Sequence, residues 1–229
     1  MKKHINSKIG LLLCSFFYIS TATAATFDFS YTNLGVSGGA THTSVGMSDN
    51  GIDVEVQAYT IDNDGAGNIN SKSLINSAGR GVYVSSTNSG NLGVRSRQHS
   101  DSNNLDGGNS FYDPDEGLLF SFDSLVSLEY INFDYFYNDT FNLTVDGVST
   151  LFNINRNSVS PLVSGVPSEA DEFYFFNITG KEFLFWADDN SARFRIDTLK
   201  VSAVPIPAAL FLFAPALLAF FGFRRKAQA

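Results

Sequence analysis

The central part of the chain alternates apolar and polar residues with a period of two. The alternation is clearest at residues 27–31, 52–59 and 141–145, and it gives each segment one apolar and one polar face, as in a β-strand with one buried side. Other segments are rich in β-branched and aromatic residues and are separated by Gly, Asn, Asp and Ser, which form turns. These segments are residues 81–85, 118–122, 126–137, 148–154, 173–178, 183–186 and 194–201. We expect no helix between the two ends of the chain.

Two local features refine this pattern. The alternation changes phase at Tyr130-Ile131, which predicts a β-bulge, because one extra residue turns the following side chains to the other face. Asp146-Gly147 separates two strand-like segments and favours a tight hairpin turn. Many short strands at intervals of about ten residues are typical of all-β folds, and we predict a single antiparallel β-sandwich, jelly-roll-like, over residues 25–202.

The C-terminal part of the chain is apolar and uncharged from Val204 to Phe223. As a helix rising about 1.5 Å per residue, this run covers a hydrocarbon core of roughly 30 Å. Arg224, Arg225 and Lys226 follow it at once, and short cationic flanks stay on the cytoplasmic side. We therefore predict a transmembrane helix at 204–223, a basic tail at 224–226, and a domain outside the cytoplasm. The alternative is a buried core helix.

The N-terminus has the pattern of a secretory signal. Lysines at positions 2, 3 and 8 precede an apolar run at 9–19, and Ala22 and Ala24 are the small residues that signal peptidase requires. We expect a signal peptide at 1–24, cleaved between Ala24 and Ala25. Cys14 is the sole cysteine and follows the bulky Leu13, which argues against a lipoprotein signal. The mature chain then has no cysteine for disulfides, thiol chemistry or metal binding.

The order of parts at residues 203–229 resembles the PEP-CTERM family of sorting signals, in its Val-Pro-x-Pro-Ala variant. The matching residues are Val204, Pro205, Ile206, Pro207 and Ala208, then the apolar run, then Arg224, Arg225 and Lys226. The resemblance implies an exosortase, a membrane peptidase that cuts near the proline motif. It also implies an inner-membrane intermediate with a periplasmic domain, and delivery to the surface or matrix of a Gram-negative bacterium that produces exopolysaccharide.

A second resemblance concerns residues 81–201. The segments 92–94, 106–108, 115–123 and 194–201 are similar in layout to ectodomains that precede such tails, and to carbohydrate-binding jelly rolls. This resemblance implies the fold and leaves the ligand open.

The predicted mature domain is strongly acidic. All 23 Asp and Glu residues lie within it, whereas six of the 15 cations lie in the terminal segments, which leaves nine cations and a net charge of −14. Phosphate binding requires the opposite sign, so nucleic acid is excluded as a partner. The acidity suits solubility outside the cytoplasm; calcium binding and repulsion from anionic glycans are the alternatives.

The sequence contains little that indicates catalysis. The mature chain keeps only His42 and His99, and neither Gly-x-Ser-x-Gly nor His-Glu-x-x-His occurs. Asp113, Asp115 and Glu116 lie close together, as the paired carboxylates of a glycosidase would, but the segment is read more simply as a solvated turn before a strand. We expect no enzymatic activity, with a secreted glycoside hydrolase or lyase as the alternative.

Calcium is the one cofactor that the sequence suggests. Asp62 and Asp64 stand two apart on a glycine-rich loop, and such spaced oxygen ligands suit a hard cation. Asp188 and Asp189 form a second acidic loop, and Asp197 on the last strand could complete a site. The same Asp-Asn-Gly chemistry also makes ordinary turns, so a structural calcium and no metal both stay open.

Aromatic residues could form a platform for sugars, because sugar rings stack on aromatic faces. The candidates are Tyr59, Tyr83, Tyr112, Tyr135, Tyr137 and Trp186, although most aromatics on alternating strands belong to the core. Together these features predict an exported cell-surface or extracellular-matrix protein that binds or organises exopolysaccharide. Besides the enzyme, a structural subunit of a surface layer is an alternative.

Overall fold

The computed structural model describes residues 22–86, 91–96, 104–106, 115–134, 136, 140–166, 169–187 and 192–205. The chain divides into a compact unit at 23–204 and a second unit made of 1–22 with 205–229. Nearly all of the predicted signal peptide and transmembrane helix therefore lies outside the described residues. Within the described part, no helix combines the length and the apolar character that crossing a membrane requires.

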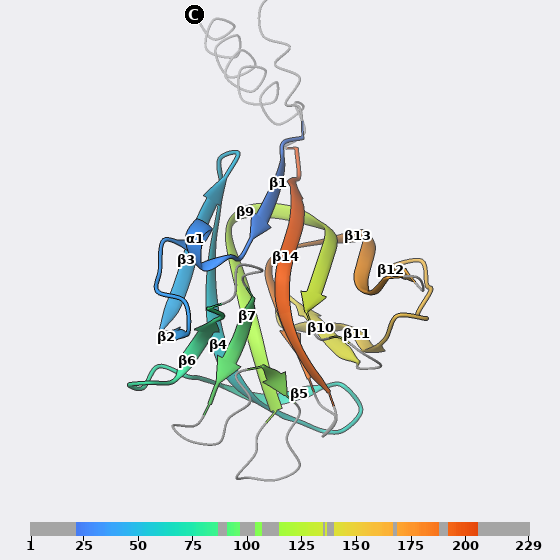
Figure 1. Cartoon of the computed structure of the whole chain (residues 1–229). Helices are drawn as coiled ribbons and strands as arrows, with labels where there is room; N and C mark the ends of the chain where they lie inside the picture. Colours follow the sequence, from blue (N-terminus) through green and yellow to red (C-terminus); the bar gives the residue numbers. More distant parts are fainter. Residues whose placement is uncertain are drawn as a thin grey trace, which may run out of the picture. The chain divides into compact units, whose positions relative to one another are not determined.

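The unit at 23–204 is built from antiparallel β-strands (Figure 1). One four-residue helix, α1 (Tyr31–Leu34), accompanies them. The all-β prediction is therefore confirmed. The strands are β1 (Ala24–Asp28), β2 (Ala40–His42), β3 (Ser44–Asp49), β4 (Ile52–Asn63), β5 (Ile69–Leu74), β6 (Gly81–Val84), β7 (Leu92–Arg95), β8 (Leu105–Asp106), β9 (Asp115–Asp134), β10 (Phe141–Val145), β11 (Val148–Ile154), β12 (Val163–Val166), β13 (Glu169–Trp186) and β14 (Arg193–Ala203).

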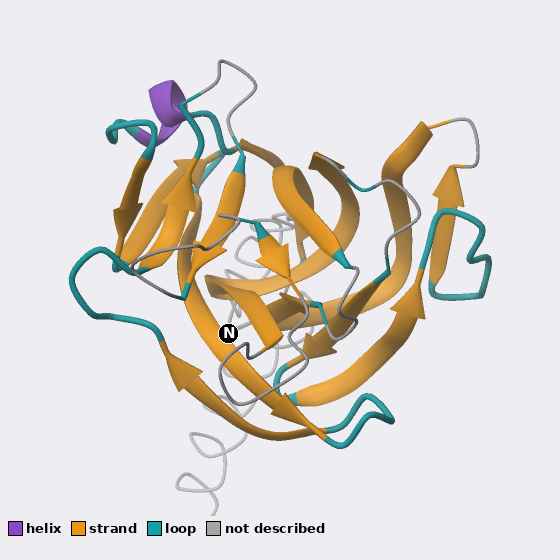
Figure 2. Cartoon of the chain, turned by 60° about the horizontal axis from the view of Figure 1, so that its bottom comes forward, coloured by secondary structure: helices purple, strands orange, loops and turns teal. Residues whose placement is uncertain are grey.

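Two long strands, β9 and β13, organise the sheet, because each half of these strands pairs with a different neighbour. The first half of β9 pairs with β4, and its second half pairs with β14. The two halves of β13 pair with β12 and then with β10, while β13 follows β9 on its other edge. The β9–β13 register shifts between their halves, and Figure 2 shows the long strands curving around a common interior.

The remaining strands extend these two groups. On the β4 side, β3 and β5 pair with successive parts of β4, and β11 pairs with β10. On the β14 side, β1, β7 and β8 pair with successive parts of β14, and β6 joins β7 to β2. The first strand thus lies beside the last one, as Figure 1 shows.

The predicted bulge in β9 is confirmed. Glu129 is skipped in the pairing with both neighbours, because Leu128 and Tyr130 face consecutive partners on β14 and flank a register shift against β13. Leu128 is buried and Ile131 is buried, two positions that a regular strand would place on opposite faces. The extra residue therefore restores core contacts for the second half of the strand.

Phenylalanine rings fill the interior. Phe133 of β9 is central: its ring contacts other rings at centroid distances of 4.8 to 6.3 Å, mostly edge to face. Each such ring contributes about 1.5–3 kcal/mol through burial, and the pair geometry adds to this. The partners come from β10, β13, β14 and the segment after β9: Phe136, Phe141, Phe173, Phe185 and Phe194.

Several local expectations need correction. The strand predicted at 27–31 is β1 at Ala24–Asp28, because Ser30 caps α1 by accepting from the Asn33 amide at 3.3 Å. The expectation of no helix is therefore wrong, because α1 forms one helical turn. The segments 118–122 and 126–137 belong largely to the single strand β9, and 173–178 with 183–186 to β13. The hairpin is confirmed, with φ of 48° at Asp146 and 80° at Gly147.

Candidate functional sites

The predicted signal-peptide cleavage bond lies at the start of β1. Ala24 pairs with Ser202 of β14, and Ala25 pairs with Val201. One residue earlier, the carbonyl of Thr23 accepts from the Ala203 amide at 2.8 Å. Ala22 and Ala24 are exposed, whereas Ala25 is fully buried. The bond between Ala24 and Ala25 is therefore part of the folded ladder.

The other edge of β1 is held by the turn between β3 and β4. The Asn50 side-chain amide donates to the Ala24 carbonyl at 2.8 Å, and the Asp49 carboxylate accepts from the Thr26 amide at 2.8 Å. Asn50 and Gly51 both have left-handed backbone angles, φ 51° and 78°, as a tight hairpin requires. Side chains of this turn thus complete the hydrogen bonding around the cleavage bond.

The predicted sorting motif begins where β14 ends. Ala203 pairs with Val126 of β9, and the Val204 amide donates to the Leu125 carbonyl at 3.1 Å. Val204 is half-buried and Pro205 is exposed. The rest of the motif and the basic tail lie outside the described residues: Ile206, Pro207, Ala208, Arg224, Arg225 and Lys226. The predicted processing segments at the two ends thus adjoin neighbouring strands.

A surface groove of about 280 Å³ lies beside β5, on the outer face of β9, β10 and β13. Its apolar lining comes from Leu119 and Leu184, which are cross-strand partners, and from Ile69. Lys72 and Glu182 are its charged lining residues, and small polar residues, Thr144 among them, complete it. The groove therefore combines an aliphatic floor with hydrogen-bonding groups.

Tyr59 and Trp186 do not line the groove, but they pack in the same apolar cluster as its residues Leu119 and Leu184. The Lys72 ammonium sits 5.1 Å from the centroid of the Tyr59 ring, and the Tyr59 hydroxyl donates to Gln57 at 3.2 Å. Burial, together with Glu182 and Glu55, raises the pKa of Tyr59, so its hydroxyl stays a donor. Trp186 is fully buried and donates through its indole N–H to the Thr144 hydroxyl at 3.3 Å. Trp186 is a core residue and not a sugar platform.

Tyr83, the other aromatic candidate that the structure describes, is not among the residues that line the groove. Tyr83 is half-buried beneath the guanidinium of Arg195, 5.6 Å from its ring centroid. Tyr112, Tyr135 and Tyr137 lie outside the described residues.

The structure adds an aromatic pair that the sequence analysis did not name. Tyr130 and Tyr174 lie 5.1 Å apart on the outer face of β9 and β13, and Tyr174 is 44% exposed. Burial and a hydrogen bond to Glu172 raise the pKa of Tyr130. The signal for this pair was the bulge itself, because the phase change moves Tyr130 from the core to the outer face.

Asp62 lies in β4, where it pairs with Ser71 of β5, so its predicted place on a loop is wrong; Asp64 lies in the turn that follows. Asp64 accepts from the Ala66 and Asn68 amides at 2.8 and 3.1 Å, and from the Asn68 side chain at 2.8 Å. These bonds lower the pKa of Asp64 and have the geometry of an ordinary Asx turn. The loop is thus ordered by its own hydrogen bonds.

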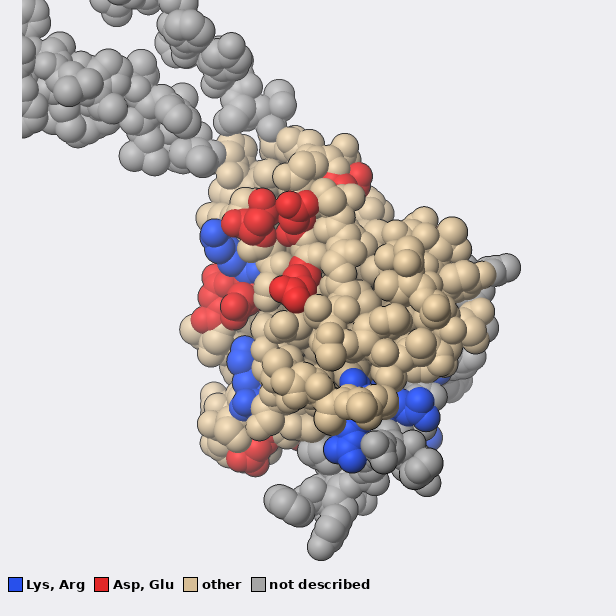
Figure 3. Space-filling view, turned by 90° about the vertical axis from the view of Figure 1, so that its left-hand side faces the viewer, with Lys and Arg blue, Asp and Glu red and all other residues tan. Residues whose placement is uncertain are grey.

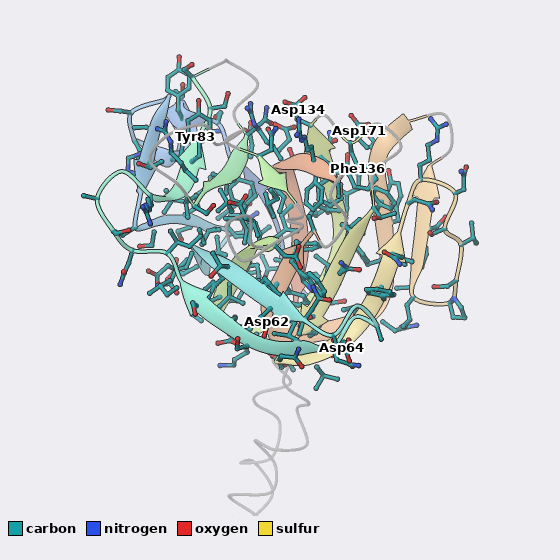
Figure 4. All side chains as sticks on the ribbon, turned by 90° about the horizontal axis from the view of Figure 1, so that it is seen from below. Asp62, Asp64, Tyr83, Asp134, Phe136 and Asp171 are labelled. Carbon is teal, nitrogen blue, oxygen red and sulfur yellow. The ribbon has the colours of Figure 1, made fainter. Side chains whose placement is uncertain are left out.

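Asp197 has a different set of acidic neighbours. Burial, with the carboxylates of Asp28, Asp134 and Asp171, raises the pKa of Asp197 to about 6. Figure 4 shows Asp134 and Asp171 on the opposite side of the domain from Asp62 and Asp64. In the described part of the chain, no three His, Cys, Asp or Glu side chains are grouped so that they could hold a metal. Asp188 and Asp189 lie outside that part, so the calcium site stays a prediction.

Of the three candidate catalytic carboxylates, the structure describes Asp115 and Glu116. Asp113 and His99 lie outside the described residues. Asp115 accepts a hydrogen bond from the Asn63 side chain, and Glu116 is 1% exposed. The expectation of a solvated turn is therefore wrong for Glu116, which is buried in β9. Asp115 and Glu116 are consecutive in a strand, so their side chains point to opposite faces and cannot flank one glycosidic bond.

Charged side chains on the face shown in Figure 3 form several small acidic and basic groups and no continuous field of one sign. Nucleic-acid interfaces instead gather Lys and Arg along one surface. Nothing on this face therefore favours a nucleic acid as partner.

Comparison with protein-family models, with curated proteins and with solved structures finds no match for this chain.

Proposed function

We propose that this chain is an exported cell-surface or extracellular-matrix protein that binds or organises exopolysaccharide through its β domain. The order of parts at the two termini supports export, a single membrane span and sorting. The geometry at the edge of the domain supports the same proposal, because Thr23 and Ala203 are hydrogen-bonded neighbours. A domain tethered by membrane segments at both ends needs its two ends on one side.

The resemblance to PEP-CTERM signals supplies the proposed route. Signal peptidase removes residues 1–24, one span at 204–223 holds the chain in the inner membrane, and an exosortase-type peptidase cuts near Pro205. The domain is then delivered to the cell surface or matrix. We also propose that the fold is a jelly-roll-like β-sandwich, since β9 and β13 bend between two groups of partner strands.

The groove beside β5 is the observation that carries the binding proposal. Half-buried Ile69 offers an aliphatic contact for the C–H face of a sugar above the largely buried Leu119 and Leu184, and the polar lining offers donors and acceptors for hydroxyls. Glu182 is the one carboxylate among the described lining residues, whereas glycoside hydrolysis ordinarily uses two. The groove therefore favours binding over cleavage.

Calorimetric titration of the mature protein with the producer's exopolysaccharide tests this proposal. We expect binding that Lys72→Ala and Glu182→Gln each weaken about tenfold, since one lost charged hydrogen bond is worth roughly 1.5–3 kcal/mol. Lys200→Ala is the matched control, because it removes an exposed lysine paired with Glu129 at 3.2 Å elsewhere. No measurable affinity would refute the binding proposal.

The two alternatives give different results in the same samples. Release of reducing ends that Glu182→Gln abolishes would indicate an enzyme. Self-association of the purified protein in the absence of sugar would indicate a surface-layer subunit.

A further inference from the structure

The bond between Ala24 and Ala25 lies in a strand that is hydrogen-bonded along both edges, although the Ala24 side chain is exposed. We propose that docking of β1 shields this bond from signal peptidase, so that efficient removal of the leader precedes the pairing of β1 with β14. This proposal rests on the signal peptide of the proposed function and adds an order to it: cleavage first, closure of the sheet second.

Hydrogen bonds occupy both edges of the cleavage segment. Ser202 and Ala203 of β14 lie along one edge, and Asn50 with Asp49 holds the other. A peptidase binds its substrate as an extended chain and needs those same main-chain groups, as in strand addition. The Ala24 carbonyl, which would become the oxyanion, is already bonded to Asn50. A peptidase cannot engage this bond while β1 stays docked.

Burial prevents β1 from detaching alone. Ala25, Phe27 and Phe29 are all fully buried. The Phe27 and Phe29 rings pack in tilted arrangements against Phe122 and Phe120, with centroid distances of 6.0 and 5.5 Å. Freeing the cleavage bond therefore pulls aromatic side chains out of the main core. Such openings are rare in a native protein, and cleavage that depends on them follows the population of the open form.

The order of the strands leaves time for cleavage. β1 directly follows the leader, but its partner β14 is the last strand of the domain. During export from the N-terminus, the cleavage bond emerges first and the strand that covers it emerges last. The unpaired segment is accessible in that interval, and pairing between chain ends is intrinsically slow.

Purified signal peptidase acting on the full-length precursor in detergent tests the proposal, with intact mass as the readout. We expect the urea-unfolded precursor, diluted into the assay, to be cut between Ala24 and Ala25. The native precursor should be cut at least about 100-fold more slowly. Equal rates would overturn the shielding proposal. An uncut unfolded precursor would instead overturn the signal peptide itself.

Variants of the β3–β4 turn test the mechanism of shielding. Asp49→Ala combined with Asn50→Gly removes both side-chain bonds to β1 and keeps the left-handed turn, because glycine tolerates that backbone. We expect about a tenfold faster cut of the native precursor. Asp53→Ala, which removes an exposed carboxylate on the same hairpin, should leave the rate unchanged. A double variant as resistant as the native precursor would show that the turn does not shield the bond.

Discussion

Asp197 shows how the irregular part of β14 affects a single residue. The β9–β14 register shifts between Ile196 and Thr198, so Asp197 has no paired residue on β9. Its carboxylate accepts from the Thr198 hydroxyl at 3.2 Å, yet burial and three nearby carboxylates raise the pKa of Asp197 to about 6 from an ordinary 3.8. The folded protein therefore binds this proton more tightly than the unfolded chain does.

The sign of this shift predicts a pH-dependent effect of Asp197→Asn. A raised pKa gives stability that is present below pH 3.8 and is lost as the pH rises through 6. We expect the variant to be more stable than the wild type at pH 8, by about 1 kcal/mol after allowance for solvent screening. The difference should vanish near pH 3.5. Urea unfolding across this range measures it.

The control for Asp197→Asn is Asp53→Asn, which makes the same change in net charge at an exposed position on β4. Parallel pH profiles of wild type and Asp197→Asn would contradict the assignment. The same titrations with calcium and with EDTA test the predicted ligand role: a calcium ligand at Asp197 would make the variant less stable only when calcium is present.

The burial of single residues could be predicted only in part. The alternation of β10 placed Phe141 inside, and its ring packs against Phe133. The exposed polar face predicted for the same strand is wrong, because Asn142 and Thr144 are buried as well. The burial of Trp186 could not be predicted, because β13 is buried on both faces at this point. Phe185 packs in the main core, and Trp186 packs in a second cluster. A strand covered on both sides loses the polar alternation from which faces are inferred.

At the scale of elements, Gly81 shows where the sheet depends on a missing side chain. Gly81 opens β6 with φ of 130°, and a Cβ there would lie 2.3 Å from the carbonyl oxygen of His42 in β2. Gly46 of β3 is a matched position in an ordinary conformation, where a Cβ would lie 3.6 Å from the nearest atom, the Val54 carbonyl oxygen. Comparing alanine substitutions at the two glycines therefore separates the effect of backbone strain from the effect of a less flexible chain.

We expect Gly81→Ala to destabilise the protein by about 2 kcal/mol or more, because it combines a strained φ with a clash against a paired strand. Gly46→Ala should change stability by less than about 0.5 kcal/mol. Denaturant unfolding of both variants gives the comparison. Equal free energies of unfolding would mean that β6 and β2 can separate without loss to the rest of the fold.

The long strands were predictable, whereas β2, β3, β5 and β12 were not predicted, and neither was the pairing of strands far apart in sequence. The hairpin at Asp146-Gly147 and the bulge near Tyr130 are local features, and both were found from the sequence. The union of 118–122 and 126–137 into β9 was missed, since Asp123-Ser124-Leu125 has the composition of a turn. Pairing with β13 on both sides of this segment, up to Ser121 and again from Val126, overrides that local preference, and the register shift between these two parts accommodates the unpaired residues within one strand.

At the scale of the whole molecule, the groove and the shielded cleavage bond share one property. Each gathers residues far apart in sequence: Lys72 of β5 and Glu182 of β13 line the same groove, and Ala24 of β1 pairs with Ser202 of β14. The spacing of residues within a sequence motif does not indicate such long-range contacts. Local sequence patterns could predict the processing segments, which stay predictions, but could not indicate the groove or the hydrogen bonds on both edges of Ala24.

Leader removal should loosen the end of β14. Cleavage after Ala24 removes Thr23, whose carbonyl accepts from the Ala203 amide, while the Val204 amide keeps its bond to Leu125. In hydrogen exchange on the full chain in detergent, the Ala203 amide should exchange faster when the chain starts at Ala25 than in the precursor. The Val204 amide is the internal control and should change little. Equal protection of Ala203 in both forms would show that β9 alone holds the strand end, and that processing at the N-terminus leaves the approach to Pro205 unaltered.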